Sequence, residues 1–262
     1  MRSSALNQAD SGTQLWTVRL VATTGQVGEF YRSLSPDEQQ RAGAFRFERD
    51  KKFFVIGRGL LRALLGRYVR CAPEGIRFRY GIKGKPALAC GKLKTHFSVA
   101  YSAGRALYAI SEDRELGVDL ELVRPLSDME SIAQQFFTPT ECRDLTSVPR
   151  DQRTEAFFSC WTRKEAYAKA TGYGLSVPLN RFEVSVNLRE PAAFRKIGGD
   201  TVSEWDLFHL EPATGYVGAL AMPSVQGELC MQYFNTTEEL LAYLKMNPAS
   251  HSKQIEKQRR FS

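Results

Sequence analysis

The spacing of apolar side chains along the chain alternates between a helical and a strand period, and these changes mark out the predicted elements. Residues 50–69 carry apolar side chains three or four positions apart with basic side chains between them, which predicts a long amphipathic helix. The segment LWTVRLVA at 15–22 predicts a strand. SPDE at 35–38 combines a hydroxyl N-cap, a proline and an acid three residues on, so we expect a helix to begin there.

Three short β-type segments follow: FSVAY at 97–101, ALYAIS at 106–111 and LGVDLEL at 116–122. They are separated by SAGR and EDRE, which are typical turn sequences. We therefore expect an antiparallel meander whose last strand contains GVDLE, residues 117–121.

The second part of the chain repeats this order. TPTE at 138–141 is another hydroxyl-proline helix start, 103 residues after the first, and residues 155–171 predict a second long helix closed by Gly172. Strands that echo the earlier ones are expected near 180–186, 205–210 and 216–222.

This repeat predicts an α+β fold built as a pseudo-twofold pair of similar α+β halves. We expect a basic N-terminal half over residues 1–113, a second half over 114–246 and a polar, basic, disordered tail over 247–262.

The net charge of +7 is unevenly distributed along the chain. Residues 1–110 carry +12 and the remaining residues −5. This division suggests a polyanionic ligand bound by the first part and a cation held by the second, although unevenly shared surface charge would give the same numbers.

Cysteine and histidine content narrows the chemistry. The five cysteines are scattered without a CxxC pair, so we expect reduced, mostly buried thiols. Three histidines are too few for a His-rich metal site, and any metal is expected to be a hard cation on carboxylates. No apolar run has the length of a signal peptide core or a membrane span, so we expect a soluble cytoplasmic protein.

Two carboxylates one residue apart stand out in GVDLE. Strand side chains alternate between faces, so Asp119 and Glu121 should project together while Val118, Leu120 and Leu122 face the core. This arrangement is half of a divalent-cation site, but an ordinary half-exposed strand has the same pattern.

The helix around Trp161 strengthens the functional interpretation. Trp161, Glu165 and Lys169 are spaced four apart on one helical face that apolar residues flank, which is unusual for a surface ion pair. Three carboxylates and a lysine suit magnesium with a phosphate-bearing substrate, because Mg²⁺ prefers oxygen ligands and a lysine neutralises a departing oxygen.

At this point the chain resembles a known family. GKPAL (84–88), FSVAYS (97–102), GVDLE (117–121), FFTPTE (136–141) and WTRKEAYAKATGYGL (161–175) resemble motifs of the 4'-phosphopantetheinyl transferases of the surfactin-synthetase-activating type. Their order and spacing fit over roughly residues 30–185.

The resemblance implies an enzyme that transfers the 4'-phosphopantetheine arm of coenzyme A to a serine of an apo acyl or peptidyl carrier protein, releasing 3',5'-ADP. Coenzyme A would lie in the cleft between the halves, and Asp119, Glu121 and Glu165 would bind Mg²⁺. Lys169 would contact the pyrophosphate, and either Glu165 or Glu121 acting through a water would deprotonate the serine. We expect a monomer that binds neither nucleic acid nor a membrane.

The resemblance also implies a set of residues that bind coenzyme A: Arg41, Arg49, Lys85, Pro86, Tyr101, Ser102 and Lys169. Lys85 and Pro86 would lie beside the adenine, and Arg41 and Arg49 near the 3'-phosphate. The chain departs from the family where Tyr101 takes the place of a histidine and Ser98 that of an asparagine, so one positive charge near the phosphates is replaced by a neutral phenol.

Two other functions fit parts of the pattern. A metal-dependent phosphodiesterase or nuclease could use the same carboxylates, and a basic chain could be a non-catalytic nucleic-acid-binding module. Which carrier would be modified is open. The apolar set Leu126, Met129, Ile132 and Phe136 is either a docking surface or part of the core.

Overall fold

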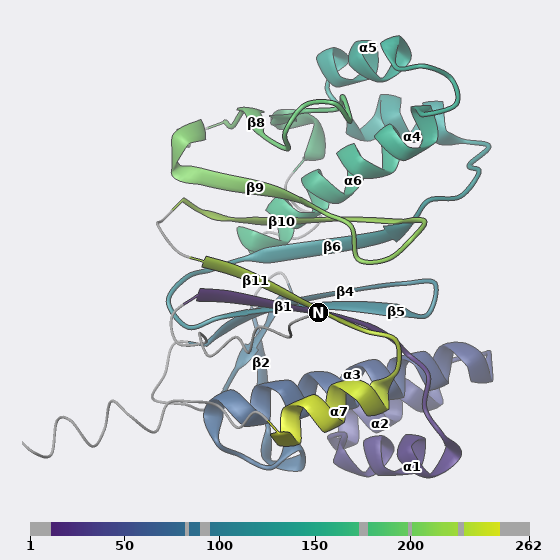
Figure 1. Cartoon of the computed structure of the whole chain (residues 1–262), viewed down its shortest axis with the longest axis vertical. Coiled ribbons are helices and arrows are strands. Elements are labelled where there is room, and N and C mark those ends of the chain that lie inside the picture. The colour runs from purple at the N-terminus through teal and green to yellow at the C-terminus, as the bar shows by residue number, and fades with distance from the viewer. Residues whose placement is uncertain are drawn as a thin grey trace, which may run out of the picture.

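The computed structural model describes residues 12–81, 84–89, 95–172, 178–198, 201–224 and 228–246. Its elements form four layers, stacked in Figure 1 as helices, sheet, sheet and helices. The α-helices are α1 Thr24–Ser33, α2 Pro36–Gly43, α3 Glu48–Val69, α4 Met129–Phe136, α5 Pro139–Ser147, α6 Arg153–Ala170 and α7 Thr237–Met246. The strands are β1 Gly12–Arg19, β2 Phe78–Tyr80, β3 Pro86–Leu88, β4 His96–Ser102, β5 Arg105–Ser111, β6 Gly117–Leu122, β7 Glu183–Val184, β8 Phe194–Lys196, β9 Trp205–Leu210, β10 Tyr216–Pro223 and β11 Glu228–Phe234.

Two main sheets lie face to face. The first has the strand order β11-β1-β5-β4 and the second β6-β10-β9, and β2-β3 and β7-β8 are short separate hairpins. Apolar side chains from both sheets, among them Leu15, Leu107, Val118 and Leu220, form the core between them. The mixed α+β class expected from the sequence is confirmed. The inner faces of the two sheets are buried against each other, and the helices cover the outer faces.

The order of elements in the first part returns in the second. One strand, three helices, a short hairpin and two strands run from β1 to β5 and again from β6 to β10. The sheet orders β1-β5-β4 and β6-β10-β9 correspond strand for strand. Both short helices α2 and α5 start with a capping box and a proline, as predicted from SPDE and TPTE.

The acid of each capping box also forms a buried ion pair with the long helix that follows. Glu38 binds Arg62 of α3 at 2.7 Å, and Glu141 binds Lys164 of α6 at 2.8 Å. These pairs stand at equivalent places in the repeated order of elements.

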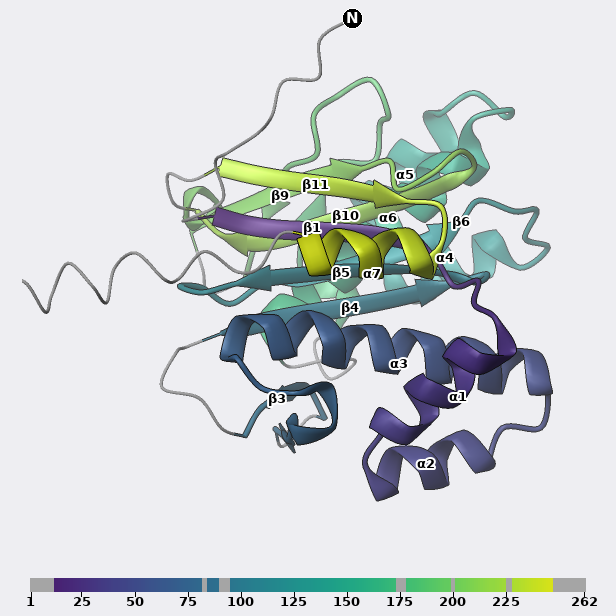
Figure 2. The same ribbon diagram turned by 60° about the horizontal axis from the view of Figure 1, so that its bottom comes forward.

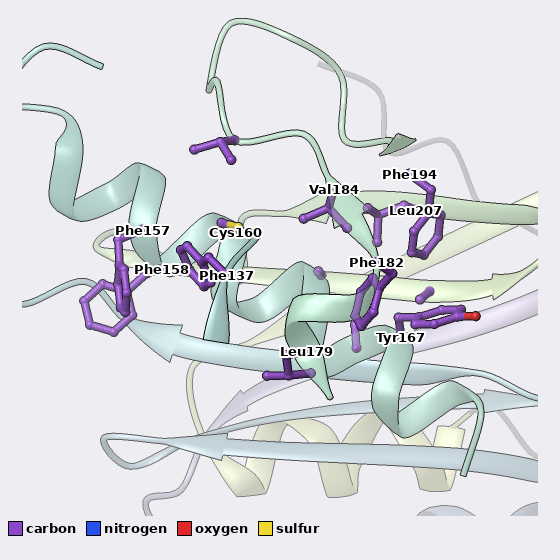
Figure 3. Packing of buried hydrophobic residues seen from close by; sticks show 14 of the residues in the cluster. Phe137, Phe157, Phe158, Cys160, Tyr167, Leu179, Phe182, Val184, Phe194 and Leu207 are labelled. Atoms are coloured by element: carbon purple, nitrogen blue, oxygen red, sulfur yellow. The ribbon is translucent and has the colours of Figure 1, made fainter. Parts of the chain in front are cut away.

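The helices cover separate cores on the outer faces of the two sheets. In the second half, aromatic side chains of α6 and of the segments around it fill the space between helix and sheet, as Figure 3 shows for Phe157, Tyr167, Phe182 and Phe194. Tyr167 packs against Phe182 with 4.8 Å between ring centroids and against Phe194 with 5.0 Å. This packing fixes the position and rotation of α6.

The meander prediction is wrong for its last strand. β4 and β5 form the expected antiparallel hairpin, but the other edge of β5 pairs with β1, Gln14 lying opposite Ile110. Because that edge is taken, β6 cannot continue the sheet, and it pairs with β10 instead.

The C-terminal elements return to the first half. β11 pairs in parallel with β1, and α7 lies beside this sheet (Figure 2). α7 also packs against α3, and its Leu240 is completely buried. This placement differs from the expectation that residues 114–246 form one half. The physical reason is that β1 has a second edge, with which β11 pairs. The apolar face of α7 then packs on the core beneath α3.

Several smaller expectations can be placed on the structure. Cys71, Cys142 and Cys160 are free thiols, whereas Cys90, the side chain of Cys230 and the tail 247–262 lie outside the described residues. α1 was not predicted, since TGQVGEFYRS has two glycines and little apolar periodicity. Across the part of the chain that the structure describes, no helix combines the length and apolarity needed to cross a membrane.

Candidate active site

The site lies where α6 crosses β6, and a glycine permits their contact. A Cβ on Gly117, at the start of β6, would lie 2.1 Å from the Ala166 carbonyl oxygen and 2.3 Å from the Ala170 nitrogen. The helix backbone therefore rests directly on the strand. This close approach brings the last turns of α6 over the acidic residues of β6.

One narrow stripe of α6 remains accessible. From Ala156 to Ala170 every residue is buried except Trp161, Glu165 and Lys169. These three follow one another at four-residue intervals, as the helical period predicted. The side chains of α6 that the sequence singled out are therefore the ones that the core leaves accessible.

The alternation of β6 is confirmed for Val118, Asp119 and Leu120, whereas Leu122, also predicted to face the core, is half-buried. Val118 and Leu120 lie in the core between the sheets. Asp119, on the opposite face, is only 7% exposed, and its Oδ1 accepts a hydrogen bond from Lys169 Nζ at 2.6 Å. Lys169 thus reaches across from the helix to the strand and joins the two elements that carry the site.

The three carboxylates influence one another. Burial raises the pKa of Asp119 against the opposing charge of Lys169. Burial, followed by the negative charges of Asp119 and Glu121, raises the pKa of Glu165, and the pKa of Glu121 is raised by burial and by Asp119. Three acids whose pKa values are all raised form a site that a cation would stabilise.

The carboxylate oxygens of Asp119, Glu121 and Glu165 are the ligands that a hard divalent cation prefers, but these side chains are not arranged around a common point. Among the described residues, Asp119 Oδ2 and Glu165 Oε1 are buried without a hydrogen-bond partner. No group of three or more His, Cys, Asp or Glu side chains in the described ranges is arranged to hold a metal ion. Two of the carboxylates instead accept hydrogen bonds from neighbouring side chains: Asp119 from Lys169, and Glu121 from Ser102.

Two serines link the sheets beside this site. β4 and β6 belong to different sheets, but the hydroxyl of Ser98 accepts a hydrogen bond from Val118 N at 3.0 Å and that of Ser102 from Leu122 N at 3.1 Å. Ser102, which the family resemblance assigns to coenzyme A, also donates to Glu121 Oε2 at 2.8 Å. Its hydroxyl is therefore already engaged with the strand that carries the acids.

The basic residues predicted to bind a nucleotide occupy different positions along the first half. The Arg41 guanidinium lies 5.2 Å from the centroid of the Phe54 ring, and Arg49 is exposed and paired with Asp50 at 3.2 Å. Tyr101 packs edge-on against Tyr108, with ring centroids 6.2 Å apart, and nearly half of its surface is exposed.

Arg58 is a charged residue near Tyr101 that sequence reasoning missed. It binds Glu38 and donates to the Tyr80 hydroxyl at 3.0 Å, and its guanidinium lies 4.1 Å from the centroid of the Phe78 ring. The sequence showed it only as one basic position on a helix. No local signal distinguishes it, because its partners come from two other segments, α2 and β2.

Lys85 lies at the junction of the two halves. Its Nζ binds Glu115 at 2.7 Å and also donates to the carbonyl oxygens of Leu116, at 3.3 Å, and Ala170, at 3.1 Å. Pro86, also predicted beside the adenine, follows at the start of β3 and is half-buried. The loop that contains Lys85 is thereby tied to both β6 and α6.

Comparison with known proteins gives the class of this fold and site. Residues 115–221 match the family model of the 4'-phosphopantetheinyl transferase superfamily, and residues 22–110 match that of the 4'-phosphopantetheinyl transferase N-terminal region. The chain is 38% identical to the 4'-phosphopantetheinyl transferase HetI of Nostoc sp. over 79% of this chain and 86% of that protein. It is 30% identical to the 4'-phosphopantetheinyl transferase Sfp of Bacillus subtilis over 60% of this chain and 69% of that protein.

A solved structure of a holo-(acyl-carrier-protein) synthase from Bacillus anthracis is also similar, with a TM-score of 0.36 and 18% identity over 43% of this chain and 96% of that one. The sequence relationships define a class of transferase enzymes. The chain belongs to the 4'-phosphopantetheinyl transferase superfamily.

Proposed function

We propose that this enzyme transfers the 4'-phosphopantetheine arm of coenzyme A to a serine hydroxyl of an apo carrier protein. The observation that carries the proposal is the ion pair of Lys169 with Asp119 at 2.6 Å where α6 crosses β6, beside Glu165, whose pKa the charges of Asp119 and Glu121 raise. Membership of the superfamily supports the reaction, and the buried acids supply what it needs: a cation site, a proton acceptor and a lysine.

Asp119, Glu121 and Glu165 would hold Mg²⁺, which supplies charge neutralisation at the phosphates of coenzyme A when it is bound. Their oxygen donors and the two unpartnered carboxylate oxygens support this assignment. Lys169 would exchange its bond to Asp119 for one to the pyrophosphate, since an ammonium binds either oxyanion.

The transfer forms a bond between the serine oxygen and the phosphorus of the phosphopantetheine group, and breaks the bond from that phosphorus to the bridging oxygen of the pyrophosphate. Glu165, or Glu121 through a water, accepts the serine proton, and 3',5'-ADP leaves with the bridging oxygen. Lys169 would stabilise the negative charge on the leaving group.

The nucleotide would lie against the first half, where Arg41, Arg49 and Tyr101 offer charge and a hydroxyl, with Lys85 and Pro86 at the junction. The two halves would be related by a pseudo-twofold axis with this binding cleft between them, as the repeated order of elements supports. We further propose that the enzyme acts as a monomer in the cytoplasm.

The carrier protein would approach along the accessible stripe of α6. Phe136, in the apolar set predicted as a docking surface, packs edge-on against Trp161 at 5.5 Å between ring centroids. Trp161 lies one turn from Glu165. Leu126, Met129 and Ile132 of the same set are half-buried and pack on the core between α6 and its sheet, and their exposed parts would contact the carrier.

The test is incubation with coenzyme A, Mg²⁺ and a panel of apo fatty-acid, polyketide and peptidyl carriers, read by intact-protein mass. We expect at least one carrier to gain the phosphopantetheine arm, and chelation of the metal to stop the gain. Glu165→Gln should lower the rate by roughly 10²–10⁴-fold, the usual contribution of an acid-base group.

Glu155→Gln is the matched control, since Glu155 is exposed on the same helix away from the site. It should transfer at the wild-type rate. A wild-type protein that modifies no carrier, or that releases nucleotides from DNA or RNA without a protein acceptor, contradicts the proposed function. Undiminished transfer by Glu165→Gln contradicts the role of that residue.

A further inference from the structure

Ser102, at the end of β4, holds an unusual position between two sheets. Its hydroxyl accepts a hydrogen bond from the Leu122 backbone N–H at 3.1 Å and donates one to Glu121 Oε2 at 2.8 Å. A hydroxyl has a single hydrogen to donate, so the accepted bond leaves that hydrogen for the carboxylate. The two contacts together set where the Glu121 side chain can point.

We propose that Ser102 is a positioning residue that orients the Glu121 carboxylate for the divalent cation of the site. The inference rests on the proposed function for the identity of the cation. It assigns to Ser102 a role toward an acid of the site rather than toward coenzyme A.

The topology explains why such a residue is needed. β6 pairs with β10 on one edge, and its other edge faces β4, which belongs to the other sheet. The serine hydroxyls take the place of backbone pairing there. Glu121 lies near the end of β6 and is only half-buried, so packing restrains it less than Asp119. Residues that hydrogen-bond to a metal ligand typically contribute roughly 10–100-fold to metal affinity.

Ser98 provides a matched control within the same strand. Ser98 lies four residues earlier and is 7% exposed, and its hydroxyl accepts a hydrogen bond from Val118 N at 3.0 Å, so it links β4 to β6 in the same manner. The hydrogen bonds found for it include no carboxylate. Loss of Ser98 therefore weakens the junction of the strands without releasing Glu121.

The experiment compares Ser102→Thr with Ser102→Val, which have the same shape and differ only in the hydroxyl. Binding of Mn²⁺, as a probe for Mg²⁺, is measured by electron paramagnetic resonance on the metal-free full chain, without coenzyme A or carrier. We expect Ser102→Val to bind Mn²⁺ roughly 10–100-fold more weakly than wild type, and Ser102→Thr to retain wild-type affinity. Ser98→Ala should lower the melting temperature and leave Mn²⁺ affinity unchanged.

Equal affinity of the Thr and Val variants, or an equal loss of affinity in Ser98→Ala, would overturn the proposal. A higher KM for coenzyme A with unchanged Mn²⁺ affinity would overturn it as well, since Ser102 would then be a coenzyme A ligand. If Ser102→Val does not fold, Ser102→Ala against Ser98→Ala makes the same comparison. A wild-type protein in which Mn²⁺ affinity depends on the Ser102 hydroxyl but no carrier is modified would support the role of Ser102 and contradict the proposed function.

Discussion

Individual ionisable residues report how strongly tertiary burial changes their chemistry. Burial raises the pKa of Asp119, and burial together with the charge of Asp119 raises the pKa of Glu165, whereas the pKa of the base His209 on β9 is lowered. The pKa of His209 is lowered by burial and by the positive charge of Arg163, with Glu211 opposing. The sequence contains all of these residues but not the distances between them.

The lowered pKa of His209 gives a prediction on pH and stability. The unfolded chain takes up the proton at the ordinary value of 6.5, whereas the folded protein resists it. The contribution to the free energy of unfolding is therefore fully present above pH 6.5 and declines as the pH falls from there toward the lowered value. His209→Gln should flatten this decline.

Urea unfolding of both proteins at about pH 5 and about pH 8 measures the effect. His209→Gln should lose less stability than wild type between the two conditions. An identical or steeper loss in the variant would show that His209 is not held neutral. Glu211→Gln is the control, because the charge of Glu211 opposes the lowered pKa of His209. Its removal should increase the loss of stability between about pH 8 and about pH 5.

At the scale of elements, the contact between α6 and β6 positions the whole site. The four-residue spacing of Glu165 and Lys169 on the helix and the two-residue spacing of Asp119 and Glu121 on the strand place each pair on one face of its element. The contact itself depends on Gly117, where no side chain separates the two backbones. The sequence shows this glycine as part of GVDLE, and only the packing of α6 explains it.

Gly117→Ala should force the helix away from the strand. The added Cβ would meet backbone atoms that cannot rotate aside, so we expect a loss of about 1–3 kcal/mol or more in the free energy of unfolding. The displacement should also separate Lys169 from Asp119 and reduce transfer. Denaturant unfolding and the carrier assay measure the two effects.

Gly28→Ala is the contrasting variant. Gly28 lies within α1, and an added Cβ would meet no atom within 4 Å, so alanine should stabilise the helix by roughly 0.5–1 kcal/mol. A Gly117→Ala protein as stable and active as wild type would show that the backbones have room to spare. Destabilisation by both variants alike would point to a general cost of the substitution.

At the scale of the whole molecule, Lys85 makes three polar contacts across the junction of the two halves. The resemblance implied a place beside the adenine, whereas the structure shows the ammonium bound to Glu115 and to carbonyl oxygens of β6 and α6. Glu115 also binds His96 Nδ1 at 3.0 Å. This group of contacts connects the β2-β3 hairpin and β4 to the second half.

The variant Lys85→Met distinguishes a structural role of Lys85 at the junction of the halves from a role in binding coenzyme A. Because the lysine bonds to charged and carbonyl groups across the junction, its loss should lower the free energy of unfolding of the ligand-free protein by about 1–3 kcal/mol. Thermal unfolding without coenzyme A tests this, and Arg79→Met is the control, since Arg79 donates to the Leu88 carbonyl oxygen within the same hairpin. Unchanged stability with a higher KM for coenzyme A would assign Lys85 to the ligand alone.

The sequence by itself determined the local structure and the chemical inventory of this protein. Capping boxes at Ser35 and Thr138, the alternation around Asp119 and the stripe of Trp161, Glu165 and Lys169 depend on neighbours within a few residues, so their periods were readable. The tertiary structure alone decided the pairing: β6 leaves the first sheet, β11 returns to it, Lys169 binds Asp119, and Ser102 holds Glu121. These outcomes depend on which strand edges remain open and which groups meet across large sequence separations, and local side-chain spacing carries no information on either.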